Sequence, residues 1–287
     1  MAITERGVDA MTAAGTDGRS TTPAKLSARG VSVSFASNAG DDVVAIEDLN
    51  LDVAEAEIVC IVGPSGCGKS TFLSAITGLA PVTSGVLEVD GKRVTGPERN
   101  RALVFQHAAL LPWRNVLANV TYGLEPARMS KRDRVNRARK YLSLVGLSSR
   151  EKAYPHELSG GMQQRVNLAR ALAVEPDILL FDEPFAALDA QTRELMQREV
   201  AGILEHERRT VLFVTHDIGE AILLGDRIVV MTARPGRVLD VIDIDLPRPR
   251  SAATEQDPRF GEYRARIWKL IEAQVKLSGD FEFGPGD

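Results

Sequence analysis

Cysteine is scarce in this chain, and long apolar runs are missing. Among 287 residues there are only Cys60 and Cys67, which are too few for a disulfide framework. No stretch approaches the roughly 18 consecutive apolar residues of a membrane-spanning helix, and the N-terminus has no apolar segment of signal-peptide length. These absences predict a cytosolic protein that neither enters nor crosses a membrane unaided.

An excess of positive charge is also missing, because the formal net charge is -4. Dedicated nucleic-acid binders gather positive charge that neutralises phosphate groups, so the balance of charges argues against that class. Apolar residues, in contrast, make up 44% of the chain. This content is sufficient for the core of one large domain or two small ones.

Gly63 to Ser70 reads GPSGCGKS, which fits the pattern GxxxxGK[ST] of a phosphate-binding loop. The backbone N–H groups of such a loop point at phosphate oxygens, and the helix that follows presents its positive dipole end to the same anion. An apolar run at 57–62 precedes the loop as a strand would, and 70–77 reads as a helix. The alternative is an ordinary glycine and serine turn. The expected nucleotide contacts are Gly63, Pro64, Ser65, Gly66, Cys67, Gly68, Lys69, Ser70 and Thr71.

A second motif lies much further along the chain, where 178–184 reads ILLFDEP. An apolar strand therefore ends on two adjacent acids, Asp182 and Glu183. In phosphoryl-transfer sites of this kind the loop lysine, here Lys69, lies on the β- and γ-phosphates, and the loop hydroxyl, here Ser70, binds Mg²⁺. The two motifs together predict a protein that binds and hydrolyses a nucleoside triphosphate.

The rest of the sequence predicts an α/β fold. Helical patterns separate short apolar segments, which favours a largely parallel sheet with helices on both faces. Residues 1–27 are rich in threonine, alanine, glycine and serine, and they predict a disordered tail. The expected strands are 31–35, 43–51, 57–62, 178–181, 211–215 and 227–231.

A helical insertion is expected at about residues 106–160. Within it, Met129 to Val145 carries apolar side chains at helical spacing and six basic residues on the other face, which predicts an amphipathic helix. The basic face fits anionic lipid headgroups, but an ordinary solvated helix surface is the simpler interpretation.

Leu158 to Arg165 reads LSGGMQQR, and 166–174 continues at helical spacing. Ser159 is a common helix N-cap residue, and the two glycines after it expose backbone N–H groups to an anion. This string resembles the signature of the ATP-binding cassette (ABC) family, in which the anion is the γ-phosphate held by the other subunit. The resemblance adds Ser159, Gly160, Gly161 and Gln163 to the expected nucleotide contacts.

The resemblance runs from residue 31 to about 250 and includes further motifs in their expected order. Phe35 matches the aromatic residue that stacks on adenine, although a core aromatic is the alternative. Gln106 matches the glutamine whose amide reaches Mg²⁺ or the attacking water. Asp182 matches the carboxylate that holds Mg²⁺ through water, and Glu183 matches the general base. His216 matches the histidine that contacts the γ-phosphate.

By the same resemblance, the expected catalytic residues are Lys69, Gln106, Glu183 and His216, the expected Mg²⁺ ligands are Ser70, Gln106 and Asp182, and the cofactors are ATP and Mg²⁺. The family fold is a P-loop NTPase core with an antiparallel N-terminal β subdomain and an inserted α-helical subdomain. This places the ATPase domain at 28–250 and a helical tail at 251–287. One departure is Ala56, which stands where a glycine is usual.

Each motif occurs once, so a single chain cannot complete a site of this family. The resemblance implies a head-to-tail pair with a second ATP-binding subunit, in the simplest case an identical copy. Residues 186–189 match the loop that crosses between the two sites. The implied cycle is closure on two Mg·ATP, attack by a water that Glu183 orients, and separation after hydrolysis.

Segments 107–125, 185–193 and 231–238 resemble the nitrate, sulfonate and taurine branch of import ATPases. This implies an energising subunit at the cytoplasmic face of the inner membrane, with permease subunits as partners and, indirectly, an extracytoplasmic substrate-binding protein. Leu110, Leu111 and Trp113 are candidates to receive a helix of the permease, or else ordinary core residues. The solute is not encoded in this chain.

Two rival functions remain at this point. A soluble cassette protein that acts on nucleic acid or the ribosome would usually carry long coiled-coil insertions or two cassettes, and this chain has neither. A small-molecule phosphotransferase would use the same phosphate loop, but it would leave LSGGMQQR and His216 without a role.

Overall fold

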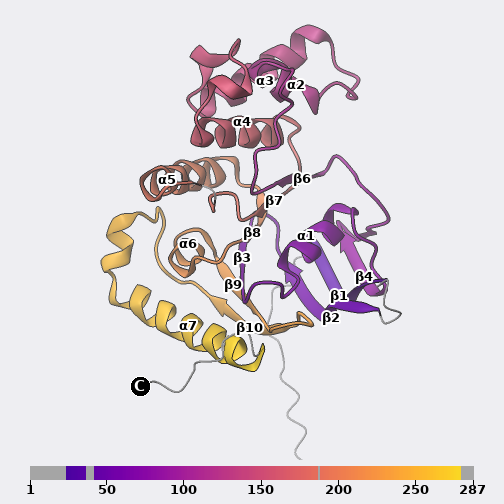
Figure 1. The fold of residues 1–287 in the computed structure, drawn as a ribbon, viewed down its shortest axis with the longest axis vertical. Coiled ribbons are helices and arrows are strands. Elements are labelled where there is room, and N and C mark those ends of the chain that lie inside the picture. The colour runs from indigo at the N-terminus through magenta and orange to yellow at the C-terminus, as the bar shows by residue number, and fades with distance from the viewer. Residues whose placement is uncertain (1–23, 37–41, 187, 279–287) are drawn as a thin grey trace, which may run out of the picture.

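Two β-sheets with helices around them make up the fold (Figure 1). The computed structural model describes residues 24–36, 42–186 and 188–278. Most of the predicted tail at 1–27 lies outside the described residues, but residues 26 and 27 already belong to the first strand, because β1 begins at Leu26. The predicted α/β fold class is confirmed.

The larger sheet has six strands in the order β10-β9-β3-β8-β7-β6. All neighbours pair in parallel except β10 and β9. Because parallel strands share one direction, their carboxyl ends meet at the same edge of the sheet. The strands are β3 (Ile58–Val62), β6 (Arg101–Val104), β7 (Ile178–Asp182), β8 (Thr210–Val214), β9 (Arg227–Met231) and β10 (Val238–Asp243).

The smaller sheet is antiparallel, with the order β2-β1-β4-β5. It contains the predicted N-terminal strands together with two strands that follow the first helix. Its members are β1 (Leu26–Phe35), β2 (Val43–Val53), β4 (Ser84–Val89) and β5 (Lys92–Arg93). Helix α1 (Lys69–Thr77) packs against strands of both sheets and so fixes the smaller sheet beside the carboxyl edge of the larger one.

Strand β3 separates two hydrophobic cores. All five of its residues, IVCIV, are buried, as expected for a parallel strand that is covered on both faces. Because successive side chains point to opposite faces, Val59 and Ile61 enter the core that contains α1 and the small sheet. Cys60 and Val62 enter the core that contains the other helices.

The inserted helices form a layer at one end of the molecule (Figure 1). They are α2 (Val116–Tyr122), α3 (Lys131–Leu144), the short η1 (Ser148–Arg150) and η2 (Pro155–Glu157), and α4 (Gly160–Ala173). α2 and α3 pack on α4, so the layer extends to residue 173, beyond the predicted limit at about 160. The apolar face of α3 centres on Tyr141, which is fully buried.

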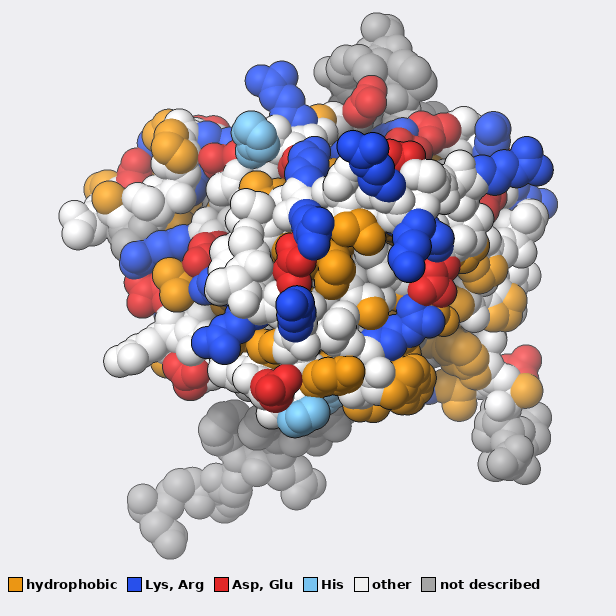
Figure 2. Space-filling model, turned by 90° about the horizontal axis from the view of Figure 1, so that it is seen from above, with side chains coloured by type: hydrophobic (Ala, Val, Ile, Leu, Met, Phe, Trp, Pro, Cys, Tyr) orange, Lys and Arg blue, Asp and Glu red, His pale blue; other side chains and the backbone are white. Residues whose placement is uncertain are grey.

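The predicted basic face of α3 is present, and three of its six basic residues, Arg137, Arg139 and Lys140, form ion pairs with acidic residues. Arg137 pairs with Glu175 at 3.0 Å, and Arg139 pairs with Glu151 at 2.9 Å. Figure 2, which views the molecule from above, shows Lys and Arg side chains scattered among apolar and acidic ones rather than as one continuous basic surface. These contacts favour a solvated helix surface over a lipid-binding one.

Helices of the C-terminal part cover the face of the large sheet that is opposite α1. They are α5 (Ala190–Glu207), α6 (Ile218–Leu224), η3 (Ala252–Gln256) and α7 (Pro258–Ser278). α7 packs on α6 and β9 and buries Phe260 and Ile267. Among the described helices, none combines the length and the apolar content that a bilayer crossing requires.

Candidate active site

The phosphate loop connects β3 to α1, and its glycines are required by its geometry. Gly66 and Gly68 adopt φ values of 72° and 97°, which residues with a Cβ rarely adopt. A Cβ at Gly68 would lie 2.7 Å from the carbonyl oxygen of Ala45 on β2, whereas a Cβ at Gly66 would meet no atom of the described residues within 4 Å. The loop is therefore packed against the small sheet on one side and open on the other, as a cradle for an anion must be.

Lys69 begins α1 and bends back over the loop. Its Nζ donates to the carbonyl oxygens of Gly63 (2.9 Å) and Pro64 (2.8 Å), and the residue is only 7% exposed. The N-cap of α1 is Gly68, which has no side chain to bond the N–H groups of the first turn. A buried ammonium and uncapped N–H groups thus face the place where the helix dipole favours negative charge.

Ser70 and Asp182 meet at the carboxyl edge of the sheet. The Ser70 hydroxyl donates to Oδ1 of Asp182 at 2.8 Å, across a separation of 112 residues. Burial raises the pKa of Asp182, and the negative charge of Glu183 adds to this effect, while the Ser70 hydrogen bond and the charge of Lys69 oppose it. A hydroxyl and a carboxylate beside a phosphate cradle are the hard oxygen donors that suit Mg²⁺.

Glu183 and His216 follow the ends of the neighbouring strands β7 and β8. Asp182 pairs with Val214 in the sheet, and the Glu183 N–H donates to the Val214 carbonyl at 3.0 Å. Nδ1 of His216 lies 3.3 Å from Oε2 of Glu183. Glu183 also lines the cavity formed by phosphate-loop residues, namely Ser65, Gly66, Gly68, Lys69, Ser70 and Thr71. The structure therefore brings the two predicted motifs and the histidine together.

Phe35 ends β1 and is 44% exposed, so the core-aromatic alternative is wrong. Phe35 pairs with Val43 on β2, two residues before the Ala45 carbonyl that contacts the phosphate loop. An exposed ring thus lies on the end of the small sheet that adjoins the loop.

Gln106 is exposed in the segment after β6, and side chains of α4 hold this segment. The Gln164 amide donates to the Phe105 carbonyl at 3.2 Å, and the Arg170 guanidinium donates to the carbonyls of Ala108 (2.9 Å) and Ala109 (3.0 Å). Asn167 accepts from Arg170 at 2.8 Å and is 1% exposed. Sequence reasoning missed these three residues, although polar side chains at 164, 167 and 170 recur every three positions along α4.

The signature residues begin α4. Ser159 is its N-cap, and its hydroxyl accepts from the Met162 N–H at 3.3 Å. Gly160 is exposed, whereas a Cβ at Gly161 would lie 2.7 Å from Thr192 of α5. The Gln163 amide bonds the carbonyls of Pro155 (2.9 Å) and Leu158 (3.3 Å), so it supports its own loop. Figure 1 places α4 in the helical layer, well apart from α1.

A mainly parallel sheet that delivers acids and a histidine to a glycine-rich loop places the chain among the P-loop nucleoside triphosphatases. The inserted layer that holds both Gln106 and the Ser159 helix narrows this class. The chain belongs to the ABC transporter family, whose model matches residues 46–186.

Three relatives support this membership. The chain is 50% identical over 239 residues to the uncharacterised ABC transporter ATP-binding protein MJ0412 of Methanocaldococcus jannaschii (83% of this chain, 88% of that protein). It is 45% identical over 252 residues to the taurine import ATP-binding protein TauB of Rhizobium johnstonii (86% and 96%). It is 43% identical over 238 residues to the nitrate import ATP-binding protein NrtD of Synechocystis sp. (81% and 90%).

A solved structure agrees with the fold. It is the dimeric structure of a post-hydrolysis state of the ATP-binding cassette MJ0796 bound to ADP and Pi, with a TM-score of 0.67 and 33% sequence identity. The match covers 76% of this chain and 98% of that one. The chain is therefore an ATPase of the import-type ABC subunits.

Proposed function

We propose that this ATPase is the energising subunit of an importer for a small solute such as taurine, nitrate or a sulfonate. The observation that carries the two-chain arrangement is that α4, which begins after Ser159, lies well apart from α1, which begins at the phosphate loop (Figure 1). Relatives named as taurine and nitrate import proteins support the solute class.

Within one half-site, each residue has a role that follows from its position. Lys69 and the uncapped N–H groups of α1 bind the β- and γ-phosphates. Ser70 and Asp182 would hold Mg²⁺, which would neutralise phosphate charge. Glu183 accepts the proton of the attacking water, and His216, which lies 3.3 Å from Glu183, contacts the γ-phosphate. Phe35 would stack on the base, and Gln106 would be a further ligand for the cation, on a segment that α4 anchors.

A second copy of the chain supplies the other half-site. Ser159 and Gly160 are exposed at the start of α4, so their hydroxyl and N–H groups are free to bind the γ-phosphate of a partner. The dimeric post-hydrolysis structure of MJ0796 supports this arrangement. Two identical chains placed head to tail then give two equivalent sites.

The segment around Gln106, from Phe105 to Trp113, is the proposed contact with the permease at the cytoplasmic face of the membrane. Phe105 is 44% exposed and Trp113 is 71% exposed, so two aromatic side chains face outward near the glutamine. A substrate-binding protein would deliver the solute to that permease. The net charge of -4 and the names of the relatives do not favour the nucleic-acid alternative.

The dimer is tested with Glu183→Gln, which keeps the shape of the site but removes the proton acceptor. We expect ATP to convert this variant from monomer to dimer on size-exclusion chromatography. Lys69→Ala is the matched control, because it should neither dimerise with ATP nor release phosphate. A Glu183→Gln chain that stays monomeric with ATP, or a fully active Lys69→Ala chain, would contradict the proposal.

Deletion of the gene should abolish growth on one of taurine, an alkyl sulfonate or nitrate as sole sulfur or nitrogen source.

A further inference from the structure

Glu220 is a buried carboxylate that the reaction described above does not use. It lies on α6, four residues after His216, and is 6% exposed. The Thr215 hydroxyl donates to Oε2, and the Gln197 amide donates to Oε1 at 3.1 Å. Within the described part of the chain, no lysine or arginine forms an ion pair with it. A buried charge without a paired cation is costly, so its position calls for an explanation.

The two donors connect Glu220 to two different parts of the chain, the segment that carries His216 and helix α5. Thr215 directly precedes His216, and its hydroxyl also accepts from the Asp217 N–H at 2.9 Å. The Asp217 carboxylate in turn accepts from the Glu220 N–H at 3.1 Å. Thr215, Asp217 and Glu220 therefore form a closed ring of hydrogen bonds, and Thr215 and Asp217 are the two residues that flank His216 in the chain.

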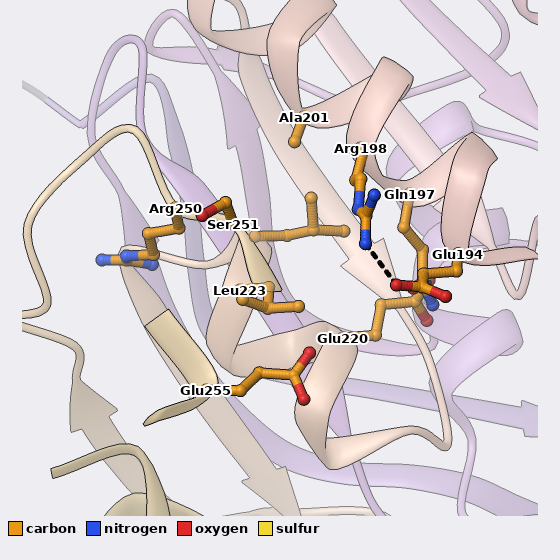
Figure 3. Close-up of a pocket in the computed structure, with 10 residues that line it drawn as sticks. Glu194, Gln197, Arg198, Ala201, Glu220, Leu223, Arg250, Ser251 and Glu255 are labelled. Carbon is orange, nitrogen blue, oxygen red and sulfur yellow. Dashed lines mark hydrogen bonds and ion pairs between the residues drawn. The ribbon is translucent and has the colours of Figure 1, made fainter. Parts of the chain in front are cut away.

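Gln197 lies on α5, the helix that begins directly after residues 186–189. Figure 3 shows Glu220 reaching from α6 toward Gln197, with Glu194 and Arg198 on the same helix and Arg250 and Glu255 across the cavity. Glu220 also lines a second cavity, on its other side, together with Glu183 and His216. It thus lies between α5 and the pair that faces the γ-phosphate.

The charge state of Glu220 decides whether this connection holds. Both neighbours donate, so the ionised carboxylate is the form that satisfies them. Burial, helped by the charge of Asp217, raises the pKa of Glu220 to about 7 against the opposing hydrogen bonds from Thr215 and Gln197 and the charge of Arg193. Other ionisable groups near it are the Cys60 thiol and the charged side chains of Glu194, Arg198, Arg250 and Glu255.

We propose that Glu220 is a positioning residue that fixes His216 relative to Glu183 and couples that pair to α5. The proposal rests on the roles assigned to His216 and Glu183 above. A shift of α5 would carry Gln197 with it, and the Glu220 carboxylate would transmit that shift through Thr215 to the His216 loop. Glu220 itself does not touch the nucleotide.

The test is Glu220→Gln in the full-length chain, assayed by phosphate release. We expect kcat to fall about tenfold, because the amide cannot accept from both donors, while KM for ATP changes less than twofold because the phosphate loop is intact. Wild-type kcat should fall as the pH drops through 7, since protonation of Glu220 loses one acceptor, and this decline should be absent in Glu220→Gln. Thr215→Val should reproduce the loss of kcat, and Thr215→Ser should retain activity.

Glu194→Gln is the matched control, because it makes the same change of glutamate to glutamine at an exposed residue of α5, one turn before Gln197. Wild-type kcat and pH profile in Glu220→Gln would overturn the proposal, as would an equal loss of kcat in Glu194→Gln. If Glu220→Gln does not fold, the pair Thr215→Val and Thr215→Ser decides the question. His216→Ala tests the role of His216 separately from that of Glu220, because full activity in that variant would refute the role assigned to His216 itself.

Discussion

The two acids that end β7 show how a single backbone dihedral arranges chemistry. Glu183 has a φ of 46°, in the left-handed region, so the chain turns sharply after Asp182. Asp182 then points to Ser70, while Glu183 points to His216. Such conformations cost about 1–3 kcal/mol and persist at functional sites when the surroundings hold them, here through the Glu183 N–H bond to Val214. Adjacent residues thereby serve different parts of one site.

Ala56 is the departure from the family pattern, and the structure explains why glycine is usual there. Its φ is 58°, and the residue is exposed. We expect Ala56→Gly to raise the free energy of unfolding by about 0.5–1 kcal/mol, because relief of the left-handed strain exceeds the extra entropy of glycine in the unfolded chain. Chemical denaturation measures the change.

Ala54→Gly is the control for this prediction, since Ala54 is also exposed but has an ordinary φ. That substitution should lower stability by roughly 0.5 kcal/mol through entropy alone. Equal effects of the two substitutions would show that the backbone at Ala56 carries no strain.

Residues within contiguous motifs could be predicted from the sequence, and residues that support them could not. GPSGCGKS and FDEP bring their chemistry and spacing in one string, and the structure places both at one edge of the sheet. Glu220 lies on a short helix where a surface carboxylate is the ordinary expectation, and only the packing of α5 shows that it is buried. Phe35 was ambiguous because exposure is a tertiary property.

At the scale of elements, strands were predicted where both faces are buried. β3, β7 and β8 are short apolar runs, and each is found within one or two residues of its expected bounds. β4 and β10 were missed because each has six residues and buries at most two of them. β6 has four residues and begins with a buried arginine, so its sequence, RALV, gives little periodic signal.

Helix α4 anchors the segment around Gln106, which gives a prediction at this scale. Arg170→Ala leaves the carbonyls of Ala108 and Ala109 without their donors, so we expect a loss of about 1–3 kcal/mol in the free energy of unfolding. We also expect a several-fold fall in kcat, because the glutamine segment loses its support. Denaturant titration and phosphate release measure the two effects.

Arg198→Ala provides the comparison, because Arg198 is an exposed arginine on α5 that pairs with Glu194 one turn earlier. Loss of an exposed pair should cost about 0.5 kcal/mol or less. If Arg170→Ala costs no more than Arg198→Ala and leaves kcat unchanged, α4 does not hold the glutamine segment.

At the scale of the whole molecule, the proposed composite site predicts complementation between inactive variants. Gly160 is exposed, and among the described residues its added Cβ would meet only Leu188, so Gly160→Asp should fold normally while its charge repels the γ-phosphate of a partner. Lys69→Ala disables the other half-site. Equal mixing of the two should restore up to about a quarter of wild-type phosphate release, since half of the dimers then hold one intact site.

Gly161→Ala is the contrasting variant for this experiment. Its added Cβ would lie 2.7 Å from Thr192, so it should lower the melting temperature where Gly160→Asp does not. Two folded variants that recover neither activity nor an ATP-dependent mixed dimer would contradict the composite site.

The two cysteines can report separately on local opening of the two hydrophobic cores. Cys60 lies in the core under the helices, and Cys67 lies in the core beside α1. Burial raises the pKa of both thiols, so alkylation of either one requires a transient opening of its own side of β3. The rates of alkylation at Cys60 and Cys67, followed by mass spectrometry in the unmodified chain, therefore measure how often each of the two hydrophobic cores opens.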